Sequence, residues 1–178
     1  TNRTHGDLRE LNWQHFSGPW SLLMGLGKVF WGVTESRHLV DIINQTDLVE
    51  DIDEEQKLGQ PIVLLERWSE WGSVGLFIMP GFRERTFPAE DARLRGPFPI
   101  SSNAVYESSA EDNRVDVALR WSNSLDDWDL GLSGFYGTGR EPRLVPVLRP
   151  EKGLELVPHY DVISQIGVDT QFTRGAWL

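Results

Sequence analysis

An acidic run between Asp47 and Glu55 is the first group of side chains whose spacing suggests chemistry. Within it Asp51, Asp53 and Glu55 alternate with other residues. Because hard cations prefer several carboxylate oxygens, these three residues are a weak Ca²⁺ candidate. Gln56 stands where the sharp turn of a calcium-binding loop needs glycine. A solvated acidic loop is the simpler interpretation, and we predict neither a metal site nor a cofactor.

A second group of polar side chains alternates with apolar neighbours along extended segments. Its members are Asp116, Arg120, Asp129, Asp169 and Gln171. Alternate residues of a strand project from the same face of a sheet, and rings of charged side chains set the selectivity of pores. These five residues are therefore our candidates for the lining of a pore.

Enzyme motifs do not occur in the sequence. The four histidines show no H-E-x-x-H spacing, and there is no Gly-x-Ser-x-Gly motif. Ser36, His38 and Asp41 are close in sequence, but the members of a catalytic triad converge in space rather than along the chain. We predict that the protein is not an enzyme.

Arginines gather around the segment 83–120, at Arg83, Arg85, Arg93, Arg95, Arg114 and Arg120. They could line a pore mouth or bind the anionic groups of lipopolysaccharide. The simpler interpretation is pairing with nearby carboxylates, namely Glu84, Glu90, Asp91 and Glu111.

The elements that must position these residues are strands, because the dominant period of the sequence is two. In 115–122 the apolar residues Val115, Val117, Leu119 and Trp121 share one face, and the pattern repeats after a predicted turn at 123–127. The expected strands are 8–16, 20–32, 61–69, 73–83, 113–122, 128–137, 160–173 and one starting at 176. One helix candidate lies in 35–49, where Leu39, Ile42 and Ile43 have helical spacing.

The connections between these strands alternate strictly between short and long. The short ones are 17–19, 70–72, 123–127 and 174–175, and the long ones are 33–60, 84–112 and 138–159. An antiparallel up-and-down meander through a bilayer has short periplasmic turns and long outer loops, as in outer-membrane barrels. The length of loop 33–60 and its apolar patch suggest that it folds inward as a constriction.

Six of the eight tryptophans fall beside the short turns. They are Trp20, Trp68, Trp71, Trp121, Trp128 and Trp177. Outer-membrane barrels carry aromatic girdles at the membrane interfaces, and these six residues are our candidates for one girdle. A soluble sandwich with aromatic residues at its strand ends would show a similar pattern.

The composition narrows the classes of protein further. No apolar run approaches the roughly 18–20 residues of a transmembrane helix, and hydrophobic residues make up 39% of the chain. A net charge of −10 argues against a nucleic-acid partner. Gly25, Gly27, Gly75, Gly131 and Gly167 fall among the polar positions of the strands, where they suit a crowded lumen better than a solvated exterior.

The segment 27–47 resembles the porin-like Gram-negative outer-membrane barrels of unknown function called the DUF1302-like family. The likeness rests on a glycine-containing strand that ends in Trp31-Gly32, and on the following Ile43, Asn44 and Asp47. The chain departs from this pattern at Val33, where the family has glutamate, with Glu35 two positions later, and at Gln45 in place of proline. The resemblance implies a channel-like barrel longer than this chain.

Together these patterns predict an all-β fold, with residues 1–178 as one segment of a longer transmembrane β-barrel of the bacterial outer membrane. The expected function is porin-like passage of small solutes, with outer-membrane lipid and lipopolysaccharide as partners. A soluble β-barrel or sandwich that binds a ligand and a structural barrel without an open lumen are the two alternatives.

Overall fold

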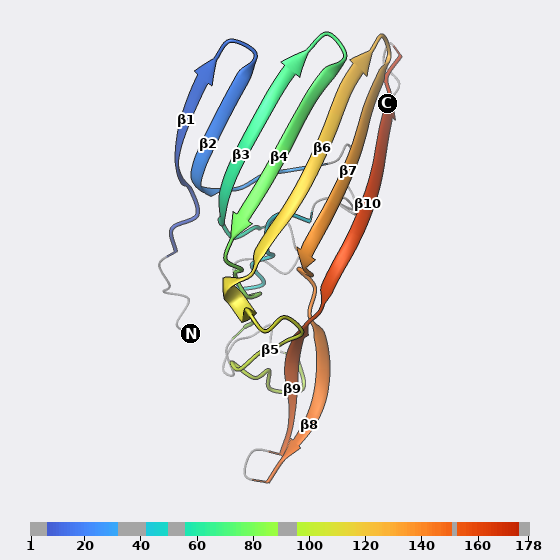
Figure 1. The fold of residues 1–178 in the computed structure, drawn as a ribbon. Coiled ribbons are helices and arrows are strands. Elements are labelled where there is room, and N and C mark those ends of the chain that lie inside the picture. Colours follow the sequence, from blue (N-terminus) through green and yellow to red (C-terminus); the bar gives the residue numbers. More distant parts are fainter. Residues whose placement is uncertain (1–6, 32–41, 50–55, 89–95, 151–152, 175–178) are drawn as a thin grey trace.

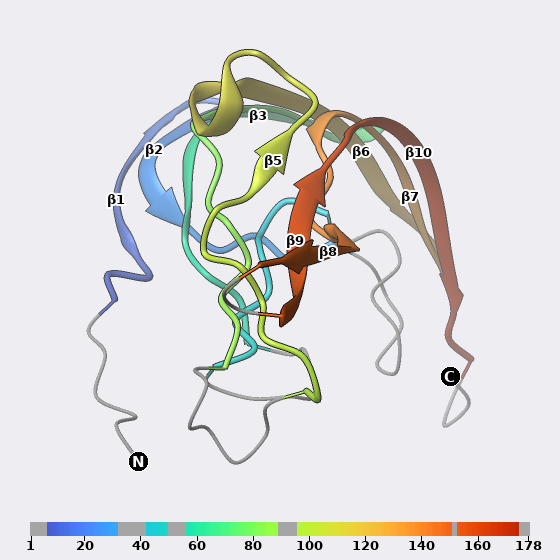
Figure 2. The same ribbon diagram turned by 90° about the horizontal axis from the view of Figure 1, so that it is seen from below.

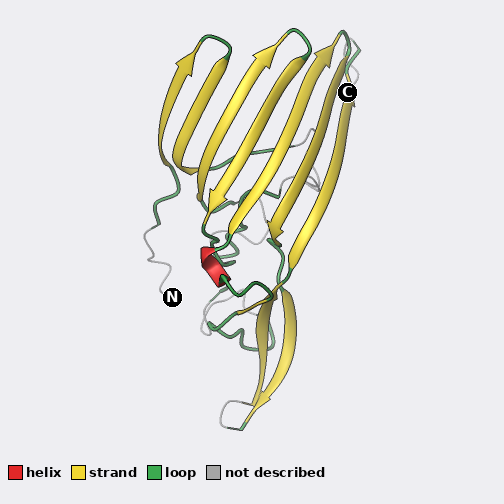
Figure 3. Cartoon of the chain, viewed as in Figure 1, coloured by secondary structure: helices red, strands yellow, loops and turns green. Residues whose placement is uncertain are grey.

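The computed structural model describes residues 7–31, 42–49, 56–88, 96–150 and 153–174, and within them the fold is all-β (Figure 3). Seven strands form the main sheet, and three form a smaller sheet. The main sheet consists of β1 (Leu11–Ser17), β2 (Trp20–Gly27), β3 (Gln60–Ser69), β4 (Gly72–Pro80), β6 (Val115–Leu125), β7 (Trp128–Thr138) and β10 (Val162–Phe172). The smaller sheet consists of β5 (Val105–Tyr106), β9 (Gly153–Tyr160) and β8 (Arg143–Arg149). A single 3₁₀ turn covers Glu111–Asn113.

The main sheet is an antiparallel meander in the order β1-β2-β3-β4-β6-β7-β10. Its three hairpin turns lie at one end of the sheet, and the longer connections lie at the other, as Figure 1 shows. The predicted alternation of short and long connections is therefore confirmed for the described residues. Within them β1 and β10 are the two edges, and the sheet does not close into a barrel.

Each hairpin turn has two residues, and the adjoining residues pair directly across it. Ser17 pairs with Trp20, Ser69 with Gly72, and Leu125 with Trp128. Two-residue hairpins need backbone with positive φ at central positions. Gly18 supplies it in the first turn with φ of 57°, and Asp126 in the third with φ of 52°. Short polar or glycine turns thus hold the register that separates the two faces of the sheet.

The sheet is strongly curved and arches over the loops, as the view from below shows (Figure 2). We call the side toward the loops the concave face and the opposite side the convex face. On β6 the concave face carries Asp116, Ala118, Arg120 and Ser122, and the convex face carries Val115, Val117, Leu119 and Trp121. The predicted alternation is correct here, and the curvature identifies the polar set as the inner one.

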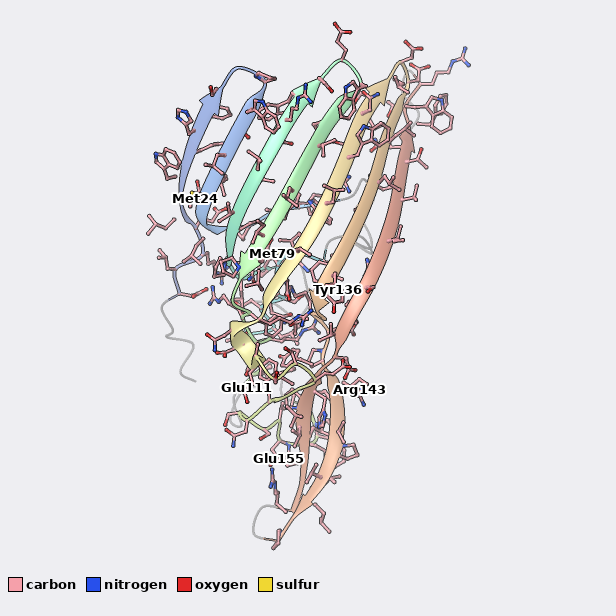
Figure 4. The ribbon with its side chains drawn as sticks, viewed as in Figure 1. Met24, Met79, Glu111, Tyr136, Arg143 and Glu155 are labelled. Atoms are coloured by element: carbon pink, nitrogen blue, oxygen red, sulfur yellow. The ribbon has the colours of Figure 1, made fainter. Side chains whose placement is uncertain are left out.

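The smaller sheet corrects the prediction that 138–159 is a long irregular loop. This segment contains β8 and most of β9, which pair antiparallel as a hairpin that projects beyond the main sheet (Figure 1). The sequence does not predict these strands because the segment contains prolines, and proline is disfavoured inside a β-strand. Pro146 is tolerated because β8 is an edge strand, paired in the described residues with β9 alone. Arg143 and Glu155 mark this hairpin in Figure 4.

The helix candidate at 35–49 is not supported where the structure describes it. Residues 42–49 form bends, turns and isolated bridges, among them the antiparallel bridge from Thr46 to Lys57. The rest of that candidate, the strand expected from 176 and Gly175 of the fourth short turn lie outside the described residues. No helix among the described residues is long and apolar enough to cross a membrane.

Candidate functional site

The concave face has two parts, and one is covered by loop residues. We call the covered part the packed region. There Trp31 and Ile43 from the loops join side chains of four strands in one buried apolar cluster, with Ile62, Phe77, Met79, Ala118 and Phe135. The ring of Trp31 meets that of Phe77 edge-on at a centroid distance of 5.0 Å. The packed region therefore fills the end of the concave face that lies nearer the long connections.

The other part lies toward the hairpin turns and is open. This open region is a hollow of about 350 Å³ lined mainly by small and polar side chains, among them Ser73, Arg120, Ser122, Asp129 and Asp169. The hydroxyls of Ser73 and Ser122 lie 2.9 Å apart across β4 and β6. Ser124 donates a hydrogen bond of 2.5 Å to Asp129. The wall of the open region is thus a surface of hydroxyl and charged groups.

An ion pair crosses this wall from β6 to β10. Both terminal nitrogens of Arg120 donate to the carboxylate of Asp169, each at 2.9 Å. The guanidinium also lies 5.5 Å from the ring centre of Trp31, at the border of the packed region. A bidentate pair of this kind has fixed geometry. It holds the two charges flat across the intervening strand β7.

Glycines on β7 make room for the carboxylates of the concave face. A Cβ atom at Gly131 would lie 2.2 Å from an oxygen of Asp169. A Cβ atom at Gly137 would lie 2.3 Å from the carboxyl carbon of Asp116. A side chain at either position would displace the ion pair beside it. Gly131 therefore occupies a crowded position on the concave face, as predicted. Gly137 occupies another.

A second ion pair is fully buried beneath the packed region. Arg140 donates to Asp116 at 2.7 Å, and its Nε donates to the carbonyl of Ile43 at 3.0 Å. Burial lowers the pKa of Arg140, while the charge of Asp116 opposes that shift. Arginine nevertheless stays protonated in proteins. Arg140 thereby ties the loop residue Ile43 to the end of β6.

Asn44 holds the same loop segment from the other side. Its amide donates to the carbonyls of Gly27 at 2.8 Å and Leu58 at 2.9 Å, and its oxygen accepts from the backbone of Val29 at 2.7 Å. Because Asn44 is 1% exposed, these bonds satisfy backbone groups that water cannot reach. The hypothesis that loop 33–60 folds inward agrees with its described residues, 42–49 and 56–60.

The residues that suggested the family resemblance are structural where they are described. Trp31 packs in the cluster and Asn44 bridges three backbone segments, as above. The buried carboxylate of Asp47 accepts from Arg9 at 2.9 Å and from the hydroxyl of Thr86 at 2.7 Å. Gly32 and Glu35 lie outside the described residues.

The five pore-lining candidates all come from strands of the main sheet, but their surroundings differ. Arg120, Asp129 and Asp169 line the open region. Asp116 is fully buried in the second ion pair. Gln171 pairs with Asp129 between β10 and β7, near the turn end. The structure thus brings together the candidates near the turns and separates Asp116 from them.

The predicted girdle tryptophans gather at the turn end but not on one face. Trp20, Trp121 and Trp128 have the strand parity of the convex face, whereas Trp68 lines the open region on the concave face. Trp71 is in the second turn, and its carbonyl accepts from the indole of Trp121 at 3.0 Å. A single outward girdle of all six is therefore incorrect for Trp68, and Trp177 lies outside the described residues.

The convex face is apolar and exposed across the whole sheet. Leu119 is 52% exposed, and Ile166 on the edge strand β10 is 84% exposed. Met24 and Tyr136, both labelled in Figure 4, belong to the same surface. Further exposed members are Leu65, Leu76, Ile78, Val115, Val117, Leu132, Val168 and Phe172. Alternation within a single strand predicts an apolar face of that strand, but it does not predict a continuous apolar surface across all seven strands of the sheet.

The described arginines Arg83 and Arg114 approach aspartates rather than the glutamates of their own segment. Arg83 pairs with Asp7 at 2.7 Å and donates to the carbonyl of Gly59. Arg114 approaches Asp116 at 3.5 Å. The predicted pairing with Glu84 and Glu111 is therefore incorrect for these two. Glu84 instead accepts from Tyr106, and Arg93, Arg95, Glu90 and Asp91 lie outside the described residues.

The described residues contain no cluster of three or more histidine, aspartate or glutamate side chains that could hold a metal ion. The calcium candidate Asp51, Asp53 and Glu55 lies outside that part of the chain, as do Ser36, His38 and Asp41.

Arg140 is the residue that sequence reasoning missed. It follows the end of β7 and has no place in the alternating pattern, so periodicity cannot find it. The only signal is the run Gly137-Thr138-Gly139-Arg140, in which glycines permit close approach of a partner.

No family model, curated protein or solved structure matches this chain. The resemblance to the porin-like family therefore stays a prediction, and the fold and the site carry the functional argument.

Proposed function

We propose that the main sheet is a segment of a transmembrane β-barrel in the bacterial outer membrane, and that its concave face lines a porin-like passage for small solutes. The observation that carries this proposal is the exposed apolar convex face. Soluble monomers rarely expose apolar patches larger than a few hundred Å². Lipid would cover this surface, while the polar open region would face the lumen.

The polarity of the sheet supports a membrane barrel over a soluble one. Small soluble barrels bury apolar side chains inside and expose polar ones outside. Here Arg120, Asp169 and Ser122 face inward, and Leu119, Val117 and Leu132 face outward. Transmembrane barrels have this inverted arrangement.

The ends of the sheet suit the two sides of a membrane. The two-residue turns lie at one end together with Trp20, Trp121 and Trp128. Tryptophan favours the boundary between lipid and water because its ring is apolar and its indole N–H is polar. Short turns then face the periplasm, and the long connections with the β8–β9 hairpin face outward.

The packed region would form the narrow part of the passage. Its inward segment, residues 42–49 with 56–59, is fastened by Asn44 and Arg140 to the strands on either side. The open region would then be the wider part, on the side of the turns. Solutes would cross a constriction that is fixed by buried hydrogen bonds.

Conductance in planar bilayers tests this function on the full-length protein. We expect stepwise single channels from wild-type protein, and larger steps when residues 44–58 are replaced by a short glycine-serine linker. Arg143→Gln, on the projecting hairpin, is the control with unchanged conductance. Unchanged conductance of the linker variant would refute the constriction.

A structural barrel without an open lumen is the second candidate, and the packed region favours it. The cluster around Ile43 and Phe77 is almost completely buried, so its side chains fill the space between the loop and the sheet. Protein that inserts into membranes but never conducts would support this candidate. Protein that stays soluble without detergent would refute both and favour a soluble ligand-binding protein.

A further inference from the structure

The charged side chains of the concave face would determine which ions cross the passage, an inference that rests on the proposed function. We propose that the passage prefers cations, and that Glu66 and Asp129 set this preference. Charged side chains along a pore wall attract ions of opposite sign and repel ions of the same sign. The net charge of the wall at its open part therefore decides the preference.

The Arg120–Asp169 pair contributes no net charge to the wall. Each of the two terminal nitrogens of Arg120 bonds one oxygen of Asp169 at 2.9 Å. The side chains are 16% and 8% exposed, so the pair is held at the wall rather than loose in solvent. To a passing ion the Arg120–Asp169 pair is therefore a dipole without net charge.

Glu66 and Asp129 are not compensated in this way. Glu66 is on the concave face of β3, in register with Gly75, which is in turn in register with Arg120. Asp129 accepts a hydrogen bond from the neutral hydroxyl of Ser124. Neither carboxylate has a cationic partner within 4 Å among the described residues, whereas Asp116, Asp169 and Asp47 all do. The concave face thus carries two uncompensated carboxylates near the turn end, with Asp129 in the wall of the open region and Glu66 on β3, two residues before the lining residue Trp68.

Asp129 is exposed, whereas Glu66 is half-buried and burial raises the pKa of its carboxyl. Gly75 and Ser73 on β4 and Ser122 on β6 are small, and they separate β3 from β7 in the sheet. The two carboxylates therefore come from strands that are not adjacent, and both are on the concave face. At an ionic strength near 0.1 M a fixed charge acts over about 10 Å, which suits a wall that an ion passes closely.

The test is the reversal potential of the full-length protein in a planar bilayer with a KCl gradient. We expect wild-type protein to prefer K⁺ over Cl⁻, more strongly at low salt. In the double variant Glu66→Gln/Asp129→Asn the permeability ratio should fall toward unity. Glu141→Gln removes the same charge from an exposed position beyond β7 and should leave the ratio unchanged.

A variant of opposite sign sharpens the test. Arg120→Gln leaves Asp169 uncompensated, so the preference for K⁺ should increase. Asp129→Asn alone serves if the double variant does not fold, as judged by its mobility on a gel before and after boiling.

The outcomes separate this inference from the proposed function. Channels that prefer Cl⁻, or whose preference is unaltered in the Glu66 and Asp129 variants, would refute the cation preference and leave a porin-like passage standing. Folded wild-type protein without any conductance would refute the passage, and the preference with it.

Discussion

The two faces of the main sheet are built from the same strands but follow opposite rules. On β6, Asp116 and Ala118 are at most 3% exposed, while their neighbours Val117 and Leu119 are at least 40% exposed. The inner face pairs Asp116 and Asp169 with arginines, and the outer face has exposed apolar side chains. The proposed lipid on the convex side accounts for this difference.

The largest effect is expected on the inner face, at the buried ion pair. Asp116→Asn leaves the charge of Arg140 buried without a counter-charge, and breaking such a pair costs about 3–5 kcal/mol. Asp169→Asn leaves Arg120 at the wall of the open region, where its side chain is 16% exposed and water can reach it, so we expect a smaller loss. Denaturant unfolding of both variants in lipid vesicles measures the difference. Equal losses would show that Asp116 is not sealed from water.

The next effect concerns the outer face. Leu119→Arg places a charge among the lipid chains, which costs about 2–4 kcal/mol near the middle of a bilayer. Ser122→Arg, on the concave face of the same strand, is the matched control and should cost much less. The same unfolding experiment in vesicles compares the two. A protein that tolerates Leu119→Arg as well as Ser122→Arg has no lipid on its convex face.

Alanine substitutions of two glycines on β7, one on each face, should differ in stability by a smaller amount. Gly131→Ala forces a Cβ atom into the carboxylate of Asp169, whereas Gly134→Ala meets no heavy atom within 4 Å on the convex side. Overpacking of this kind costs about 1–3 kcal/mol, so we expect that loss at Gly131 and almost none at Gly134. Similar melting temperatures for the two variants would contradict the crowded inner wall.

The smallest effect is expected on the projecting hairpin, outside both faces. Arg143 lowers the pKa of Asp161 below its usual value through two side-chain hydrogen bonds. A lowered folded-state pKa stabilises the protein above the unfolded pKa, and this stabilisation disappears as pH falls through the folded value. Arg143→Gln should therefore be slightly less stable near neutral pH and equal to wild type in strong acid. A difference that grows on acidification would contradict this pairing.

The sequence predicts the strands best where one face is apolar and the other polar. The alternation in 115–122 and 128–134 is explicit because the two faces of these strands have different surroundings in the sheet, and the paired residues agree with it. The hairpin β8–β9 does not follow from the sequence pattern, because prolines are typical of loops; Pro146 is permitted since β8 is an edge strand.

The site was predicted in part for a similar reason. Arg120 and Asp169 could be chosen because each stands at a polar position of a strand, but their pairing depends on the register of three strands. The contact of Arg140 with Ile43 joins residues 97 positions apart. Such long-range contacts follow from the curvature of the sheet, which no local pattern encodes.

The most direct test of the two faces uses the absence of cysteine from the chain. Leu119→Cys and Ser122→Cys can each be labelled with an environment-sensitive fluorophore in the full-length protein in vesicles. The account predicts that brominated lipid quenches the label at position 119 but not at 122, and that a water-soluble quencher does the reverse. Labels quenched equally from water, with no effect of brominated lipid at position 119, would contradict a lipid-facing convex surface and with it the membrane barrel.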